Sequence, residues 1–110
     1  VSLTGERLKL IIILFPSKEL VYKEEYLKAF PDFGEKYIRN EEEGYKRITA
    51  FAEKEGLLIY DLTDGLRKAR DEAVLFFNED PHLNERGNVV VANLLAGKFK
   101  EWENKGITIK

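Results

Sequence analysis

The chain has 110 residues, 44% of them hydrophobic and 12% aromatic, which is the composition of one small globular domain and not of a disordered chain. Its 18 basic and 20 acidic residues leave a net charge of −2, so no strong field attracts nucleic acid or an anionic membrane. Cysteine is absent, which excludes disulfides, thiolate metal sites and a cysteine nucleophile. We therefore expect no cofactor, no nucleic-acid partner and no insertion of this chain into a membrane.

Two further expectations follow from the longest apolar run and from the missing methionine. The run covers residues 10–15, which is too short to span a bilayer, and no signal peptide opens the chain. Methionine is absent, although a native reading frame starts with one. We therefore expect the chain to be processed or to be part of a larger protein.

The first predicted elements are a strand and a short helix. Residues 8–15 are almost continuously apolar and rich in branched side chains, which is typical of a strand covered on both faces in a parallel sheet. Pro16 ends this strand. Residues 23–29 have the spacing of a short amphipathic helix, and Pro31, Asp32 and Gly34 are expected to break the pattern after it.

A longer helix is predicted between Asn40 and Gly56. Asn40 is a suitable N-cap with Glu43 as its capping-box partner, and Gly56 is placed just past the last turn. The acidic run 41–43 suits the positive end of the helix dipole and has no metal-ligand spacing, so no metal site is expected. The expected buried face consists of Tyr45, Ile48, Phe51 and Ala52.

A second strand is predicted at residues 57–60, so strand, helix and strand follow one another as in a parallel α/β unit. Residues 61–64 can cap a helix over 65–71 that carries Leu66 and Ala69 inward. Residues 73–77 form a third apolar run, expected to be a short strand or an extended segment.

The last long element is a helix predicted over residues 85–104. Asn84 is a good N-cap, and apolar residues repeat behind it at helical spacing. Gly106 is placed to end the helix. Leu95, Phe99 and Trp102 share one stripe, which is most simply part of the core and otherwise part of an interface.

The sequence contains a single histidine, His82, two residues after Asp80, and Pro81 stiffens the backbone between them. Imidazole is the side chain that titrates near neutral pH, so proton transfer would most naturally take place here. In an extended segment residues i and i+2 project to the same side, so the carboxylate is expected to meet one ring nitrogen and leave the other free. That pair is the base and its orienting acid in a serine-hydrolase triad. The alternative is a histidine that caps, packs or hydrogen-bonds locally.

The segment around this pair resembles a known family. Residues 80–84 (Asp-Pro-His-Leu-Asn), followed by Gly87, Asn88 and the apolar positions of 90–95, resemble the last conserved block of the SGNH/GDSL hydrolase superfamily. Residues 13–22 look like a strand-end segment of relatives near the alginate O-acetylation proteins. The resemblance implies that His82 is the general base, Asp80 its partner and Asn84 a structural cap.

The resemblance covers the chain as the C-terminal half of such a domain. Three family features are missing from this sequence, namely the Gly-Asp-Ser nucleophile block, the block with the oxyanion-hole glycine and the Gly-x-Asn-Asp block. Glu79 also occupies the aspartate place of the commoner Asp-x-x-His spacing. The sequence therefore leaves open whether Glu79 or Asp80 orients His82.

The sequence offers two serines, Ser2 and Ser17. Ser2 lacks the strand that should precede a nucleophile block, so its likeness to that block is a chance match. Ser17 follows the first predicted strand, where open α/β sheets bind ligands, and with Lys18 it is a candidate substrate contact. The alternatives are a turn or cap serine and a solvated lysine.

Together these features predict an α/β domain of three-layer, flavodoxin-like architecture with a parallel sheet, present as its C-terminal portion. The resemblance implies an SGNH-type esterase or a carbohydrate O-acetyl transfer activity, with His82 and Asp80 as part of a Ser-His-Asp triad, a small-molecule or carbohydrate ester as substrate, and an extracytoplasmic location. The alternative is a non-catalytic or degenerate hydrolase module that associates with the missing N-terminal half or with itself.

Overall fold

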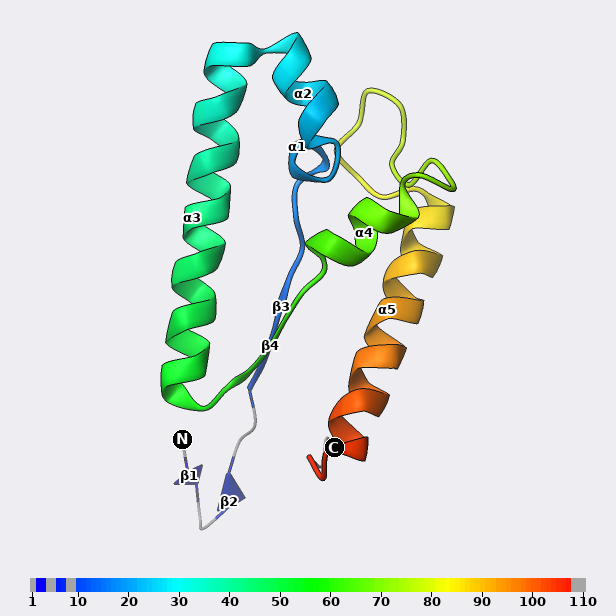
Figure 1. Cartoon of the computed structure of the whole chain (residues 1–110). Coiled ribbons are helices and arrows are strands. Elements are labelled where there is room, and N and C mark those ends of the chain that lie inside the picture. Colours follow the sequence, from blue (N-terminus) through cyan, green and yellow to red (C-terminus); the bar gives the residue numbers. More distant parts are fainter. Residues whose placement is uncertain (1, 4–5, 8–9, 108–110) are drawn as a thin grey trace.

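The computed structural model describes residues 2–3, 6–7 and 10–107. Helices dominate these residues, and the strands are short (Figure 1). In chain order the elements are β1 (Ser2–Leu3), β2 (Glu6–Arg7), β3 (Ile11–Leu14), α1 (Lys18–Val21), α2 (Lys23–Ala29), α3 (Pro31–Glu55), β4 (Leu58–Asp61), α4 (Thr63–Ala69) and α5 (Glu85–Asn104). The helix predicted over 23–29 is confirmed as α2.

β3 and β4 form a parallel pair, in register from Ile11 opposite Leu58 to Leu14 opposite Asp61. The predicted order of strand, helix and parallel strand is therefore confirmed. The first strand is shorter than predicted, because Phe15 has left the sheet and is 52% exposed, while residues 8–9 lie outside the described part. β1 and β2 form a separate antiparallel pair.

The long helix α3 begins at Pro31, so the prediction that it starts at Asn40 is wrong. A proline is accommodated in the first turn of a helix, because the N–H it lacks would have no intrahelical partner there. Gly34 is buried, and a Cβ on it would lie 3.3 Å from the Tyr26 ring, so this glycine allows α2 to approach α3. The residues that were expected to break the pattern instead start the helix.

α3 ends where it was predicted to end, but only part of its predicted buried face is buried. Gly56 has a left-handed φ of 69°, and its N–H donates to the carbonyls of the last turn. Ala52 is fully buried, whereas Ile48 is 38% and Phe51 55% exposed. Burial of Ile48 and Phe51 was predicted from spacing alone, and the described residues pack little against that side of the helix.

The core lies between the strand pair and the C-terminal helices. In Figure 1, α3 runs along one side of β3 and β4, and α4 and α5 lie on the other side. Ile13 and Tyr60 of the strands pack against the buried cluster on that second side. The cluster consists of Val21, Leu62, Leu66, Leu75, Phe76 and Val91. The chain is thus a mixed α/β protein, and the parallel sheet has two strands within the described residues.

α4 begins two residues earlier than predicted, because the Asp61 side chain accepts hydrogen bonds from the Thr63 N–H (2.9 Å) and hydroxyl (2.6 Å). Leu66 is buried as predicted, and Ala69 is half-buried. The apolar run 73–77 forms no regular strand, and its Phe76 makes an isolated antiparallel bridge with Leu83.

α5 matches its predicted range, with Asn84 as N-cap and Gly106 at a left-handed φ of 84° after its end. Trp102 is buried and stacks on the half-buried Phe99, as expected for a core stripe. Within residues 2–3, 6–7 and 10–107, no helix is both long and apolar enough to cross a membrane.

Candidate active site

A closed loop connects the apolar run to α5 and carries the histidine. Its two arms are held by the bridge between Phe76 and Leu83 and by a hydrogen bond from the Phe77 N–H to the His82 carbonyl (3.1 Å). Asn84 closes the base of the loop: its side-chain oxygen accepts from the Gly87 N–H (2.8 Å), and its amide group donates to the Val74 carbonyl (2.9 Å). Asn84 therefore caps α5, as the family resemblance implied, and also fastens the loop.

Asp80 and His82 meet, as the sequence predicted. One carboxylate oxygen of Asp80, Oδ1, lies 2.6 Å from the ring Nδ1 of His82 and accepts from its backbone N–H at 2.8 Å. The backbone contact makes an Asx turn, in which an aspartate bonds the N–H two residues on. The pair is thus joined by a turn and not by the extended geometry from which the contact was predicted.

The electrostatics of the pair favour a carboxylate and a correctly oriented imidazole. The hydrogen bonds from the His82 backbone and ring, helped by the charges of His82 and Lys18, hold the pKa of Asp80 below its usual value. In the neutral ring, a carboxylate beside Nδ1 requires the proton on that nitrogen, which leaves the lone pair of Nε2 free to accept a proton. The His82 side chain is 81% exposed, so Nε2 is accessible.

Glu79, the competing carboxylate, has a different position. Among the described residues, the hydrogen-bond partner of the His82 ring is Asp80. Glu79 has a left-handed φ of 58°, and its side chain is exposed. The structure therefore has the Asp-x-His arrangement, in which Asp80 and not Glu79 bonds the His82 ring.

Ser17 is the N-cap of α1. Its hydroxyl donates to Oε1 of Glu41 (2.6 Å) and accepts from the Leu20 N–H (3.1 Å), while its backbone N–H donates to Oε2 of Glu41 (2.8 Å). The capping role weighed for this serine is therefore present in the structure. A contact between Ser17 and substrate stays a prediction.

Lys18 contacts the histidine loop directly. Its ammonium group donates to the carbonyls of Phe77 (2.8 Å) and Asp80 (3.3 Å). Sequence reasoning missed this contact, since the partners are 59 and 62 positions away and backbone carbonyls leave no signal in a sequence. Sequence reasoning also missed the hydrogen bonds that Glu41 accepts from Ser17, 24 positions away, because the helix dipole alone explained the acidic run. A contact between Lys18 and substrate also stays a prediction.

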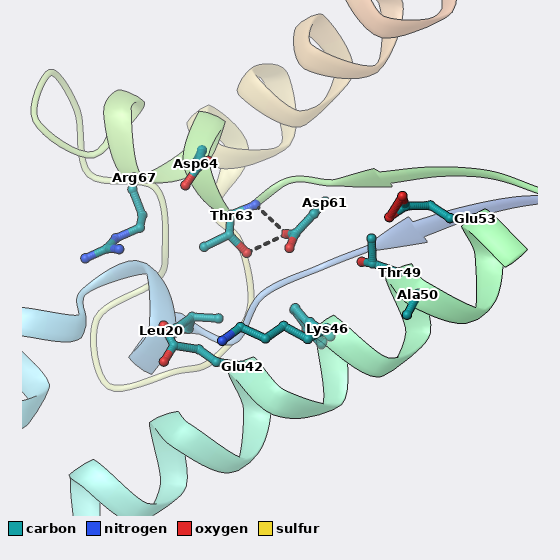
Figure 2. Close-up of a pocket in the computed structure, with 11 residues that line it drawn as sticks. Leu20, Glu42, Lys46, Thr49, Ala50, Glu53, Asp61, Thr63, Asp64 and Arg67 are labelled. Atoms are coloured by element: carbon teal, nitrogen blue, oxygen red, sulfur yellow. Dashed lines mark hydrogen bonds between the residues drawn. The ribbon is translucent and has the colours of Figure 1, made fainter.

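Two of the hollows near these residues are lined in part by α1. One, of about 420 Å³, is bounded by Lys18, Tyr22, Val74, Phe76, Phe77 and Asn78, beside the histidine loop. The other, also of about 420 Å³, lies between α3 and α4, where Figure 2 shows Lys46 and Glu42 on one side and Thr63, Asp64 and Arg67 on the other. Within the described part of the chain, no group of three or more metal-ligating side chains could hold a metal ion.

Comparison with known families agrees with the local geometry. Residues 2–107 match the family described as SGNH hydrolase-like domain, acetyltransferase AlgX. This chain belongs to that family. The SGNH resemblance, with relatives near alginate O-acetylation, is therefore confirmed. Neither the curated proteins nor the solved structures yield a match to this SGNH hydrolase-like domain.

Proposed function

We propose that this SGNH hydrolase-like domain supplies the acid–base arm of a serine acyl-transfer site, which cleaves an ester or transfers an acetyl group to a carbohydrate. The observation that carries the proposal is the contact of 2.6 Å between Asp80 Oδ1 and His82 Nδ1, with the ring otherwise exposed. In a serine triad the acid bonds this nitrogen and the serine faces the other one. The family description, which names an acetyltransferase, supports acetyl as the acyl group.

The reaction follows from the free nitrogen of the ring. A serine from outside this chain attacks the acyl carbonyl while Nε2 of His82 accepts the hydroxyl proton, and Asp80 stabilises the imidazolium that forms. Nε2 then gives that proton to the leaving alcohol. A water molecule or a sugar hydroxyl attacks the acyl-serine in the same way and releases the acid or the acylated sugar. The donors that stabilise the oxyanion also lie outside this chain.

The same proposal includes the fold. β3 and β4 are two strands of a larger parallel sheet in a three-layer, flavodoxin-like domain, and the rest of that sheet comes from a preceding segment. Two observations support it: helices flank both sides of a pair that has only two strands within the described residues, and large apolar side chains such as Leu10 and Phe15 at the strand ends are 56% and 52% exposed.

The test uses the longer protein that contains this chain. His82→Ala should lower kcat for p-nitrophenyl acetate hydrolysis by roughly 1000-fold or more, because the nucleophile loses its base. Asp80→Asn should also impair turnover, since the ring loses the carboxylate that fixes its tautomer. Glu79→Gln is the matched control, because Glu79 is the neighbour of Asp80 in the sequence and is not bonded to the His82 ring. This variant should retain activity. Unchanged turnover in His82→Ala would show that the proposal is wrong.

Measurement of the acceptor separates the two versions of the activity. An esterase releases acetate at the rate at which nitrophenol appears, whereas an O-acetyltransferase yields acetylated oligosaccharide when a carbohydrate acceptor is added. Mass spectrometry of the acceptor together with an acetate assay distinguishes them.

A second candidate function is a non-catalytic module that acts by association. The specific observation is an exposed patch at the corner between α2 and α3, here called the aromatic patch. It consists of Phe30, Tyr26, Tyr37 and Phe33, whose rings contact one another in that order. Phe33 is 68% and Phe30 53% exposed, and clusters of exposed apolar side chains mark interaction surfaces. The partner would be the missing N-terminal segment or a second copy of the chain.

A further inference from the structure

The turn that precedes the Asp80–His82 pair contains a residue in an unfavourable conformation. Glu79 has a φ of 58°, a left-handed backbone conformation that is strained for a non-glycine residue. Such a residue persists where the surrounding structure fixes the backbone on both sides of it. The side chains of this turn are largely exposed, so their packing does not fix its backbone.

Lys18 brackets the turn. Its ammonium group donates to the carbonyl of Phe77, two residues before Glu79, and to the carbonyl of Asp80, directly after it. One cation therefore holds the two ends of the turn together. The second carbonyl belongs to the residue whose carboxylate orients His82, so a change at Lys18 reaches the ring through a single residue.

The anchor of Lys18 is itself firmly held. Lys18 is the first residue of α1, and Glu41 of α3 binds both the hydroxyl and the backbone N–H of the preceding Ser17. One turn further along α3, the Tyr45 hydroxyl donates to the Phe15 carbonyl. Burial raises the pKa of Tyr45, so its hydroxyl stays protonated and remains a donor. The segment before Lys18 is thus tied to the longest helix at two positions.

We infer that Lys18 is a positioning residue that clamps the turn from Phe77 to Asp80 and thereby holds Asp80 and His82 in their reactive geometry. This inference rests on the proposed function for its catalytic consequence, whereas the clamp itself is a property of this chain. Lys18 acts through Asp80. A substrate ligand, in contrast, would contribute mainly to substrate binding.

The first experiment measures the clamp in the 110-residue chain. Lys18→Met keeps the length of the side chain and removes its hydrogen bonds, so the amides of Phe77 and His82 should exchange with deuterium about tenfold faster. Lys23→Met is the matched control, because Lys23 pairs with Glu42 and does not touch the turn. Lys18→Arg should restore most of the protection. Circular dichroism melting shows whether each variant is folded. Unchanged exchange in folded Lys18→Met would overturn the inference.

The second experiment measures catalysis in the longer protein. Lys18→Met should lower kcat by roughly 10- to 100-fold and leave KM nearly unchanged, as expected for a misplaced catalytic pair, and Lys18→Arg should recover most of kcat. A rise in KM alone would identify a substrate contact and overturn the positioning role, and so would normal kcat in a variant with rapid exchange. If the wild-type protein shows no acyl transfer at all, the proposed function fails, while the exchange experiment still decides whether the clamp exists.

Discussion

A single carboxylate oxygen of Asp80 organises both the backbone and the ring of His82. Both contacts span only two residues, so they form as soon as the local turn forms. The Asp-x-His spacing therefore predicted the pair, although the prediction assumed an extended segment and the structure has a turn. The bonds also favour the charged form of Asp80, which gives the arrangement a defined pH dependence.

The loop should lose order in acid. The pKa of Asp80 is lowered in the folded protein, so its contribution to stability is fully present above the ordinary aspartate pKa of about 3.9 and is lost as the pH falls through the lower folded value. An NMR titration of the Asp80 carboxyl carbon and the His82 amide should show one transition with a midpoint below that ordinary value. Asp80→Asn should abolish the transition. A midpoint at or above the ordinary value would contradict the hydrogen bonding described.

At the scale of elements, the start of α5 and the end of the apolar run are packed backbone against backbone. The Leu75 carbonyl accepts from the Asn84 N–H at 2.8 Å. A Cβ on Gly87 would lie 2.1 Å from that same carbonyl oxygen and 2.8 Å from the Leu83 side chain. A side chain at Gly87 is therefore incompatible with the present packing of α5 against the loop.

Two glycines of α5 should respond in opposite ways to the same substitution. Gly87→Ala should destabilise the chain by about 2 kcal/mol or more, because helix and backbone must move apart. Gly97→Ala should be neutral or stabilise it by up to about 1 kcal/mol, since alanine is the better helix former and a Cβ there meets nothing within 4 Å. Thermal melts of both variants compare them directly. Equal melting temperatures would show that the close approach at Gly87 is not required.

Element boundaries were predictable where a local signal defines them. The cap of Asn84, the glycine after α3 and the whole of α2 fall in this class, because each depends on groups within one helical turn. The start of α3 was not predictable in this way, since a proline followed three positions later by a glycine suits both a break and a first turn. The packing of α2 against Gly34 distinguishes the two, and that packing depends on tertiary structure.

At the scale of the whole molecule, the chain is more extended than its length requires. Its radius of gyration is 16.3 Å, against about 13 Å expected for a compact domain of similar length. The extents of 53 × 28 × 21 Å describe an elongated body, as Figure 1 shows for α3 and α5 on either side of the strand pair. Much apolar surface consequently faces solvent, including the aromatic patch.

The aromatic patch should promote association of the isolated chain. Sedimentation velocity over a range of concentrations should show reversible self-association, because burial of exposed rings removes apolar area from water. Phe30→Ser together with Phe33→Ser should weaken it. Phe51→Ser is the control, since Phe51 is also exposed and lies on α3 but not in the aromatic patch. A chain that stays monomeric throughout, or equal effects of both variants, would exclude the aromatic patch as an interface.

The sequence by itself determined the family, the Asp80–His82 pair, the cap of α5 and the parallel succession of strands, because each element or motif leaves its own local pattern of side chains. Only the tertiary structure decided that Glu41 holds Ser17, 24 positions away, and that Lys18 reaches the turn before His82 across 59 and 62 positions. Such contacts depend on the path of the whole chain, and the acceptors of Lys18 are backbone carbonyls, which every residue carries. A local pattern therefore identifies the candidate catalytic pair, and the fold determines what holds it in place.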